Sequence, residues 1–202
     1  HYNEYILNIW SKNVTLNKHL IDTVNQRVLS FLAKFCDQEF YERQIAQRTG
    51  IAYGSANRAL NDLYSTGAIR RRKEGKMYFY SVDYSNPAIV EFKKLVNMIL
   101  IEPLTEKLKN MSSKIVLYGS CAQGNDNSQS DLDLFIVSDD RRRVTQAIDS
   151  FSFAPGFEGI HVQAVIKSPV ELLEAGESEQ AFLAEVEQGV ILWERAANEP
   201  RL

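Results

Sequence analysis

The chain has 202 residues, of which 45% are hydrophobic and 24% are charged, and its formal net charge is −3. These shares are typical of a globular protein with an ordinary core, and they exclude the disordered and fibrous classes. Apolar runs such as residues 98–101 are far shorter than the roughly 20 residues that span a bilayer, so no membrane partner is expected.

The two cysteines, Cys36 and Cys121, lie far apart and outside any CxxC spacing. Neither a disulfide framework nor a zinc site is therefore indicated, and a reducing, cytoplasmic setting fits best.

Charged residues are distributed unevenly along the chain. Residues 1–86 hold 12 Lys and Arg against 8 Asp and Glu, while residues 87–202 hold 11 against 18. The basic N-terminal part favours a polyanionic partner.

Three helices and a hairpin are predicted in the N-terminal part. Apolar residues recur at helical spacing in residues 23–36, 41–48 and 53–64, with a turn at Thr49-Gly50 between the second and third helices. Residues 70–81, "RRRKEGKMYFYS", read as a basic strand, a turn and an aromatic strand. In this order of elements, residues 23–82 resemble a winged helix-turn-helix domain.

The resemblance implies binding to double-stranded DNA and a role in transcription regulation. The third helix of such domains enters the major groove, and the hairpin, or wing, lies along the backbone or minor groove. Side chains suited to base edges and phosphates are Ser55, Asn57 and Arg58 on the helix, and Arg70, Arg71, Arg72, Lys73 and Lys76 on the wing. The alternative is a trihelical module that packs against the other half or a protein partner, its basic strand being merely solvated.

Residues 87–112 are predicted to form a linker helix that begins at Pro87. Its apolar residues cover most of the circumference, so this helix needs two neighbours. It is buried between the domains, or it pairs with its copy in a homodimer. The dimer is favoured, because winged-helix proteins usually read two half-sites. Glu102-Pro103 is expected to interrupt or kink the helix.

Two strands are predicted at residues 114–118 and 131–137, joined by a polar segment. Alternation on the second strand puts Asp131 and Asp133 together on one face. Like charges so placed repel unless a cation neutralises them, and Mg²⁺ prefers such hard oxygen ligands. At the end of the first strand, the backbone and hydroxyl of Gly119-Ser120 are suited to hold a phosphate.

The segment 119–133, "GSCAQGNDNSQSDLD", looks like the signature of the DNA polymerase beta nucleotidyltransferase superfamily, and the resemblance extends over residues 113–194. It implies an α/β domain with a mixed sheet and Mg²⁺ bound by the catalytic Asp131 and Asp133. It also implies that a nucleoside triphosphate, ATP being the first choice, is held by Gly119, Ser120 and Ser130. The implied reaction transfers a nucleotidyl group to a hydroxyl and releases pyrophosphate.

Enzymes of this superfamily use a third carboxylate on a neighbouring strand, and the strand in "GIHVQAVIKS" has Gln163 at the expected position. An amide carries no charge and cannot serve as a general base. His161, on the same face as Gln163, is a weaker candidate for the general base. Glu158 is out of phase with Gln163, and Asp126 is expected in a flexible loop. Cys121 stands where this superfamily usually has a basic residue after Gly-Ser, and it is interpreted as a small side chain that fills the core.

Overall, the sequence predicts an α+β protein. Its parts are a winged helix-turn-helix domain (residues 1–86), a linker or dimerisation helix (87–112) and a nucleotidyltransferase domain (113–202). Three functions remain open. The protein is a magnesium-dependent nucleotidyltransferase brought to its target by the winged helix, or a catalytically impaired transcriptional regulator that senses a nucleotide or docks a partner. The third is an antitoxin-like module with a protein acceptor.

Overall fold

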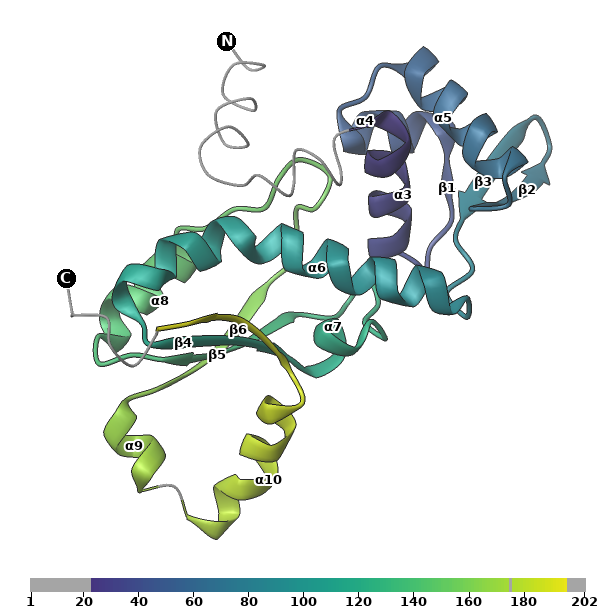
Figure 1. The fold of residues 1–202 in the computed structure, drawn as a ribbon. Helices are drawn as coiled ribbons and strands as arrows, with labels where there is room; N and C mark the ends of the chain where they lie inside the picture. The colour runs from purple at the N-terminus through teal and green to yellow at the C-terminus, as the bar shows by residue number, and fades with distance from the viewer. Residues whose placement is uncertain (1–22, 175, 196–202) are drawn as a thin grey trace. The chain divides into compact units, whose positions relative to one another are not determined.

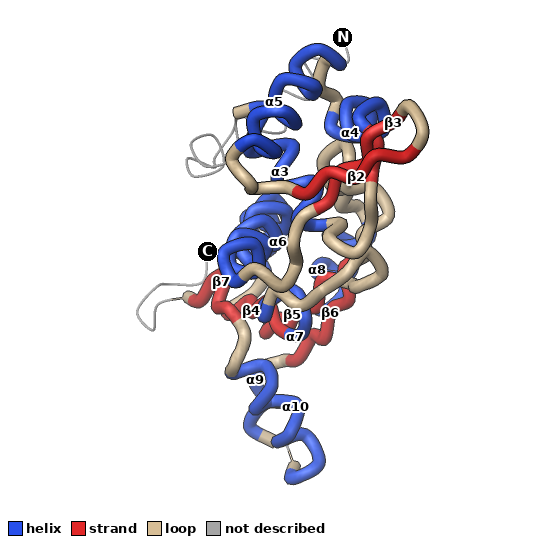
Figure 2. Tube along the Cα trace, turned by 90° about the vertical axis from the view of Figure 1, so that its right-hand side faces the viewer, coloured by secondary structure: helices blue, strands red, loops and turns tan. Residues whose placement is uncertain are grey.

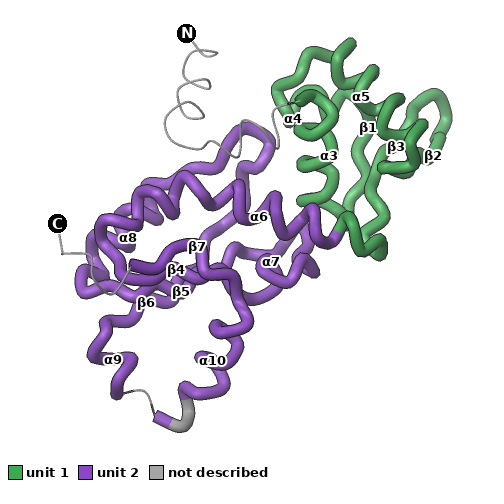
Figure 3. The backbone as a smooth tube through the Cα atoms, viewed as in Figure 1, with its two compact units in different colours: residues 1–89 green, residues 90–202 purple. Residues whose placement is uncertain are grey.

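The computed structural model describes residues 23–174 and 176–195, and the chain divides into two compact units, residues 1–89 and 90–202 (Figure 3). Each unit contains one β-sheet and several helices (Figure 1). The α+β class and the layout of a winged helix-turn-helix followed by a domain with a mixed sheet are therefore confirmed.

The three predicted helices of the N-terminal unit are present as α3 (Val24–Lys34), α4 (Glu42–Thr49) and α5 (Tyr53–Ser65). The first begins at a capping box, in which the Thr23 hydroxyl accepts a hydrogen bond from the Gln26 amide. Helix α4, the turn at Gly50 and α5 form the helix-turn-helix.

The predicted hairpin is formed by β2 (Arg70–Glu74) and β3 (Met77–Ser81), which pair in an antiparallel manner. A third strand, β1 (Phe40–Tyr41), pairs with β3 and was not predicted. Its position is fixed by Phe40, which is buried with its ring centroid 4.8 Å from that of Phe31. A strand of two residues has no alternation that a sequence pattern could reveal.

Helix α6 (Pro87–Leu108) starts at Pro87 as predicted and is followed by the 3₁₀ turn η1 (Lys109–Met111). The predicted interruption at Glu102-Pro103 is wrong, because the helix continues through Pro103. A proline inside a helix costs about 3 kcal/mol. The side chains of Ile101, Leu104 and Leu108 are fully buried, and each stabilises the fold by about 1.5–3 kcal/mol. Neither α6 nor any other described helix has the length and hydropathy needed to cross a membrane.

The C-terminal sheet contains β4 (Lys114–Tyr118), β5 (Leu132–Val137), β6 (Val162–Lys167) and β7 (Val190–Glu194). Their order across the sheet is β6-β5-β4-β7. Strands β5 and β6 are parallel, while β4 is antiparallel to both β5 and β7. The sheet is therefore mixed, as predicted.

Helices lie on both faces of this sheet, as Figures 1 and 2 show. Residues of α6 and α8 (Arg141–Asp149) form one core with β4 and β5. On the opposite face, α9 (Pro169–Leu173) and α10 (Glu177–Glu187) contribute Leu172, Phe182 and Val186 to a second, smaller cluster. The short helix α7 (Gly119–Gln123) follows β4 directly and leads into the segment before β5.

Candidate functional site

The two predicted carboxylates lie at the start of β5. Asp131 directly precedes the strand, and Asp133 is its second residue. Leu132 and Leu134 are fully buried in the core shared with α6 and α8. Both aspartates are half-buried, and Phe135 packs in the cluster on the opposite face. The predicted alternation therefore holds, and the two carboxylates belong to the face that α10 partly covers.

Gly119 brings the end of β4 against the second carboxylate. Strand residue Tyr118 is the register partner of Asp133, and Gly119 follows with a φ of 66°. A Cβ atom at Gly119 would lie 2.8 Å from Asp133 Oδ2. Only glycine tolerates both this conformation and this approach. The backbone at Gly119-Ser120 and the carboxylate therefore border the same space, and α7 begins there.

Negative charge accumulates around Asp133. Burial raises the pKa of this carboxyl, and the nearby charges of Asp131 and Glu185 raise it further. Burial also raises the pKa of the Tyr118 phenol, with smaller effects from Asp133 and Glu185. The ionised form of Asp133 is thus disfavoured, and a cation beside it would relieve both the desolvation and the repulsion.

Gln163 lies where the third carboxylate was expected. In the parallel pairing of β5 and β6, Asp133 is the register partner of Gln163. His161 is exposed and lies just before β6, and the Glu158 carboxylate accepts a hydrogen bond from the Gly156 amide at 2.9 Å. Among the described residues, no three His, Cys, Asp or Glu side chains form a group that could hold a metal ion.

Glu185 is an acidic neighbour that the sequence did not reveal. On α10, Phe182 makes edge contacts with Tyr118 and Phe135, at centroid distances of 5.6 and 5.9 Å. Val186 is buried in the same cluster. These contacts place the intervening Glu185 close enough to influence the pKa of Asp133. The spacing of Phe182 and Val186 is typical of a buried helix face, but it does not indicate which end of the sheet lies beneath that face.

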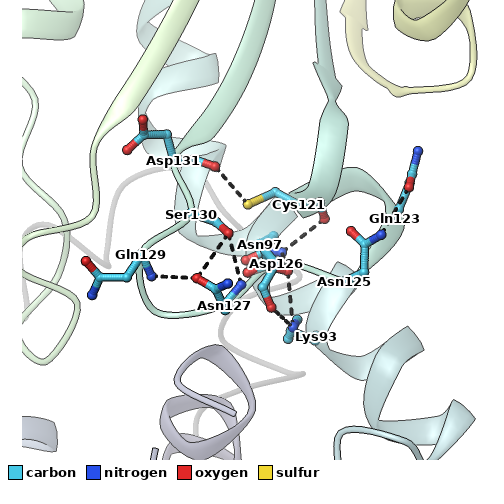
Figure 4. Close-up of polar contacts among 10 residues, drawn as sticks. All are labelled: Lys93, Asn97, Cys121, Gln123, Asn125, Asp126, Asn127, Gln129, Ser130 and Asp131. Atoms are coloured by element: carbon cyan, nitrogen blue, oxygen red, sulfur yellow. Dashed lines mark hydrogen bonds and ion pairs between the residues drawn. The ribbon is translucent and has the colours of Figure 1, made fainter. Parts of the chain in front are cut away.

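Asp126 lies in the loop between α7 and β5, as expected, and residues of α6 hold its side chain there. Its side chain is buried, and its Oδ1 atom lies 3.4 Å from Nζ of Lys93 on α6 (Figure 4). Asn97 on the same helix donates a hydrogen bond to that oxygen at 3.0 Å. No local pattern predicts this pairing, because Asn97 and Asp126 are 29 residues apart.

Cys121 and Ser130 both shape the segment before β5. Cys121 is fully buried, and its thiol donates to the carbonyl oxygen of Asp131 at 3.2 Å. The Ser130 hydroxyl accepts a hydrogen bond from the Asn127 amide at 3.0 Å (Figure 4). Cys121 therefore fills the core as expected, and the Ser130 hydroxyl forms part of a turn that leads to Asp131. Ser120 is half-buried at the start of α7.

In the N-terminal unit, the predicted DNA-contacting residues of α5 lie toward its first half. Ser55 and Asn57 are half-buried and Arg58 is exposed. The Arg58 guanidinium donates to the Ser55 hydroxyl at 3.2 Å, and the Asn61 amide donates to Asn57 Oδ1 at 3.1 Å. These polar groups are thus arranged along one part of the helix surface.

Two wing arginines are paired with carboxylates. Arg70 forms an ion pair with Asp83 at 2.5 Å. Arg72 pairs with Glu39 at 2.7 Å and Glu74 at 2.6 Å, and the hydrogen bonds that its guanidinium donates to these two carboxylates raise the pKa of Arg72. A phosphate that approached Arg70 or Arg72 would have to compete with these carboxylates.

The other wing cations lie in a different environment. The Arg71 guanidinium stacks between aromatic rings, 3.9 Å from the centroid of Tyr64 on α5 and 4.5 Å from that of Tyr78. Lys73 lies 5.9 Å from the Tyr78 ring, and Lys76 is exposed beside the hairpin turn. The structure therefore brings Arg71 into contact with α5, places Lys73 beside Tyr78, and pairs neither of them with the carboxylates that hold Arg70 and Arg72.

Comparison with known proteins gives two similarities. The crystal structure of NolR from Sinorhizobium fredii is similar over 49% of this chain and 88% of its own length, with 14% sequence identity and a TM-score of 0.33. Residues 101–198 match the model of the family described as Polymerase beta, Nucleotidyltransferase. That segment contains Gly119, Ser120, Asp131 and Asp133, and the match supports a nucleotidyltransferase-type domain in the C-terminal part of the chain.

Proposed function

We propose that the C-terminal domain binds a nucleoside triphosphate together with Mg²⁺ and transfers the nucleotidyl group to a hydroxyl acceptor. The N-terminal winged helix binds double-stranded DNA and brings this activity to its target. The observation that carries the proposal is the position of Asp133. Its carboxylate is so close to Gly119 that a single added carbon would touch it, and it shares its strand face with Asp131.

The donor set fits magnesium. Two carboxylates supply hard oxygen ligands, and Mg²⁺ is commonly held by one or two carboxylates together with water and substrate phosphates. The bound ion would neutralise charge that develops on the phosphate oxygens. The chain's own residues would bind the ion and orient the nucleotide. Asp131 and Asp133 hold the cation, and the backbone and hydroxyl at Gly119-Ser120 orient the phosphates. The acceptor hydroxyl would lose its proton to solvent water and its oxygen would bond to the α-phosphorus, while the α–β phosphoanhydride breaks and pyrophosphate leaves.

The decisive experiment incubates the full chain with Mg²⁺ and labelled nucleoside triphosphates, and compares it with the double variant Asp131→Asn/Asp133→Asn. We expect label transfer or pyrophosphate release by the wild type and loss of both in the variant. Equal release by both proteins, or no nucleotide binding by the wild type, would refute the proposal.

A second candidate function is a regulator that senses a nucleotide without turnover. It is favoured by one observation, the pairing of Asp133 with Gln163 rather than with an acidic residue. A neutral amide cannot take the proton of the acceptor hydroxyl. Nucleotide binding that depends on Asp131 and Asp133, with no pyrophosphate release for any acceptor, would identify this function. Label found on a protein would instead identify a protein acceptor.

For the N-terminal unit, we propose that α5 enters the major groove and the wing contacts phosphates. Exposed Arg58 and the wing cations support this proposal, because clustered cations beside polar helix residues favour DNA. Binding to labelled duplex DNA across a salt series tests it, and absence of binding at low salt would refute it.

A homodimer would place two such helices on two half-sites. The apolar stripe of α6 on which this prediction rests has intramolecular partners at Val96, Ile101, Leu104 and Leu108, which are buried within the chain. Sedimentation at micromolar concentration would decide between monomer and dimer.

A further inference from the structure

A buried polar cluster, Lys93, Asn97 and Asp126, joins helix α6 to the segment that precedes β5. Lys93 is 3% exposed, Asn97 0% and Asp126 2%. Lys93 Nζ lies 3.4 Å from Asp126 Oδ1 and also donates to the main-chain oxygen of Asp126. Figure 4 shows both contacts. The cluster is separate from the two carboxylates of the proposed site, and none of its members carries a role in the chemistry proposed above.

Asn97 connects this cluster to two points of the segment. Its side-chain amide donates to Asp126 Oδ1 at 3.0 Å and to the carbonyl oxygen of Cys121 at 3.0 Å. One side chain on α6 therefore holds both Cys121, within α7, and the residue five positions later. Gly124, between them, packs so closely on α6 that a Cβ atom there would lie 2.8 Å from the carbonyl oxygen of Val90.

The constraint continues from Cys121 to the first carboxylate. The Cys121 thiol donates to the carbonyl oxygen of Asp131 at 3.2 Å, while its own carbonyl is held by Asn97. A continuous series of hydrogen bonds thus runs from α6 through Cys121 to the backbone of Asp131 (Figure 4). A shift of α6 or of the loop would move Asp131 relative to Asp133, which is fixed in β5 by its pairing with β4.

Stability alone does not explain a buried ion pair at this place. Removing a lysine and an aspartate from water costs several kcal/mol each, and apolar pairs of similar volume are often as stable or more stable. Hydrogen bonds with defined directions, however, fix one backbone conformation in a way that apolar contacts do not. The cluster therefore suits a segment whose backbone position matters.

We infer that Lys93, Asn97 and Asp126 are positioning residues of the proposed nucleotidyltransferase site. They hold segment 119–131 in the conformation that presents Asp131 beside Asp133 and Gly119. Helix α6 is then part of the site's framework and not only a linker. The inference rests on the proposed function for its consequence, but the restraint on the segment can be measured without any ligand.

The test uses the full chain and two designs of variant. Asn97→Ala removes both bridging hydrogen bonds. Lys93→Met/Asp126→Leu removes both charges together, so that no unpaired charge remains buried and the protein is expected to stay folded. The matched control is Thr105→Val, since Thr105 is also buried on α6 but its hydroxyl donates to the helix carbonyl of Ile101 at 3.1 Å.

Two measurements are made below the unfolding temperature of every variant. The first is amide hydrogen exchange of residues 119–131 without ligand. The second is the affinity for Mn²⁺ in the presence of ATP, measured by electron paramagnetic resonance. For both cluster variants we expect faster exchange in this segment and Mn²⁺ affinity lower by about tenfold, the usual effect of losing a group that orients metal ligands. Thr105→Val is expected to match the wild type in both.

The outcomes separate the inference from the proposed function. Unchanged exchange in both cluster variants, or faster exchange with unchanged Mn²⁺ affinity, would overturn the positioning role while leaving the proposed function intact. If the wild type binds Mn²⁺ no better than Asp131→Asn/Asp133→Asn, the proposed function fails and the positioning role fails with it.

Discussion

Among single residues, Asp133 shows a conflict between stability and function: the charge that the proposed chemistry needs is unfavourable for folding. Its pKa is raised by burial and by the neighbouring charges of Asp131 and Glu185. A raised pKa means that this carboxyl favours folding fully below its unfolded pKa, and that the contribution is lost as the pH rises through the folded value. Where Asp133 is ionised in the folded protein and no cation is bound, its charge therefore opposes folding.

Replacing this charge is expected to stabilise the protein. In the absence of divalent cations, at a pH above the folded pKa of Asp133, Asp133→Asn should raise the thermal midpoint by about 2–4 °C, because it removes the half-buried charge. The advantage over wild type should shrink as the pH falls and when Mg²⁺ is added. Differential scanning calorimetry with and without EDTA checks this. A lower midpoint for Asp133→Asn in EDTA would contradict it.

At Gln163, the register partner of Asp133, a negative charge can be added instead of removed. Gln163→Glu places a carboxylate where the family resemblance implies the third acid, and should raise Mg²⁺ affinity and pyrophosphate release by about tenfold or more. Without divalent cations it should lower the thermal midpoint, because a further negative charge joins the site. Gln163→Ala is the control, and equal turnover by the two variants would show that this position does not limit catalysis.

At the scale of elements, the wing divides its cations between its two faces. Paired strand residues share a face, so Arg71 and Lys73 lie with Tyr80 and Tyr78 toward α5, while Arg70 and Arg72 alternate with them. The first pair faces the helix that is proposed to enter the groove, and the second pair is held by carboxylates. Arg71 and Lys73 should therefore contribute more to DNA binding than Arg70 and Arg72.

We expect Arg71→Ala and Lys73→Ala each to weaken duplex binding and to lower the slope of log K against log salt by about 1. Arg70→Ala, the matched control, should change the slope by much less. Fluorescence anisotropy at salt concentrations of about 50–200 mM measures both quantities. A larger loss for Arg70→Ala than for Arg71→Ala would reverse this assignment.

The elements also show what sequence patterns can and cannot predict. The bounds of β4 follow from an apolar, β-branched run that stops at Gly119-Ser120. The shared face of Asp131 and Asp133 follows from alternation along β5, and one strand is enough to reveal each pattern. Glu185 and Asn97 could not be found in this way, because their neighbours come from other elements. The continuous helix at Pro103 is a third case, since tertiary burial of Ile101 and Leu104 outweighs a local penalty.

At the scale of the whole molecule, α6 decides where the chain can be divided. Residues 113–202 hold the sheet of the C-terminal unit, but Ile101, Leu104 and Leu108 of α6 belong to its core and are fully buried. Losing such a residue costs about 2–5 kcal/mol, and a whole domain is stable by only about 5–15 kcal/mol.

A fragment of residues 90–202 should therefore fold, while a fragment of residues 113–202 should not. Dispersed amide signals in a proton–nitrogen NMR spectrum and a cooperative thermal transition would identify the folded fragment. Residues 113–202 with both properties would show that α6 is dispensable for this core.

The cysteines provide a means to follow the two units separately. Cys36 lies in the N-terminal unit and Cys121 in the C-terminal unit, and both thiols are buried. A thiol reagent reacts with each only when its surroundings open. Mass spectrometry of the labelled peptides would thus report the opening free energy of each unit in one sample, with the natural sequence and no attached probe. A bound duplex should slow labelling at Cys36, and Mg²⁺ with ATP should slow it at Cys121.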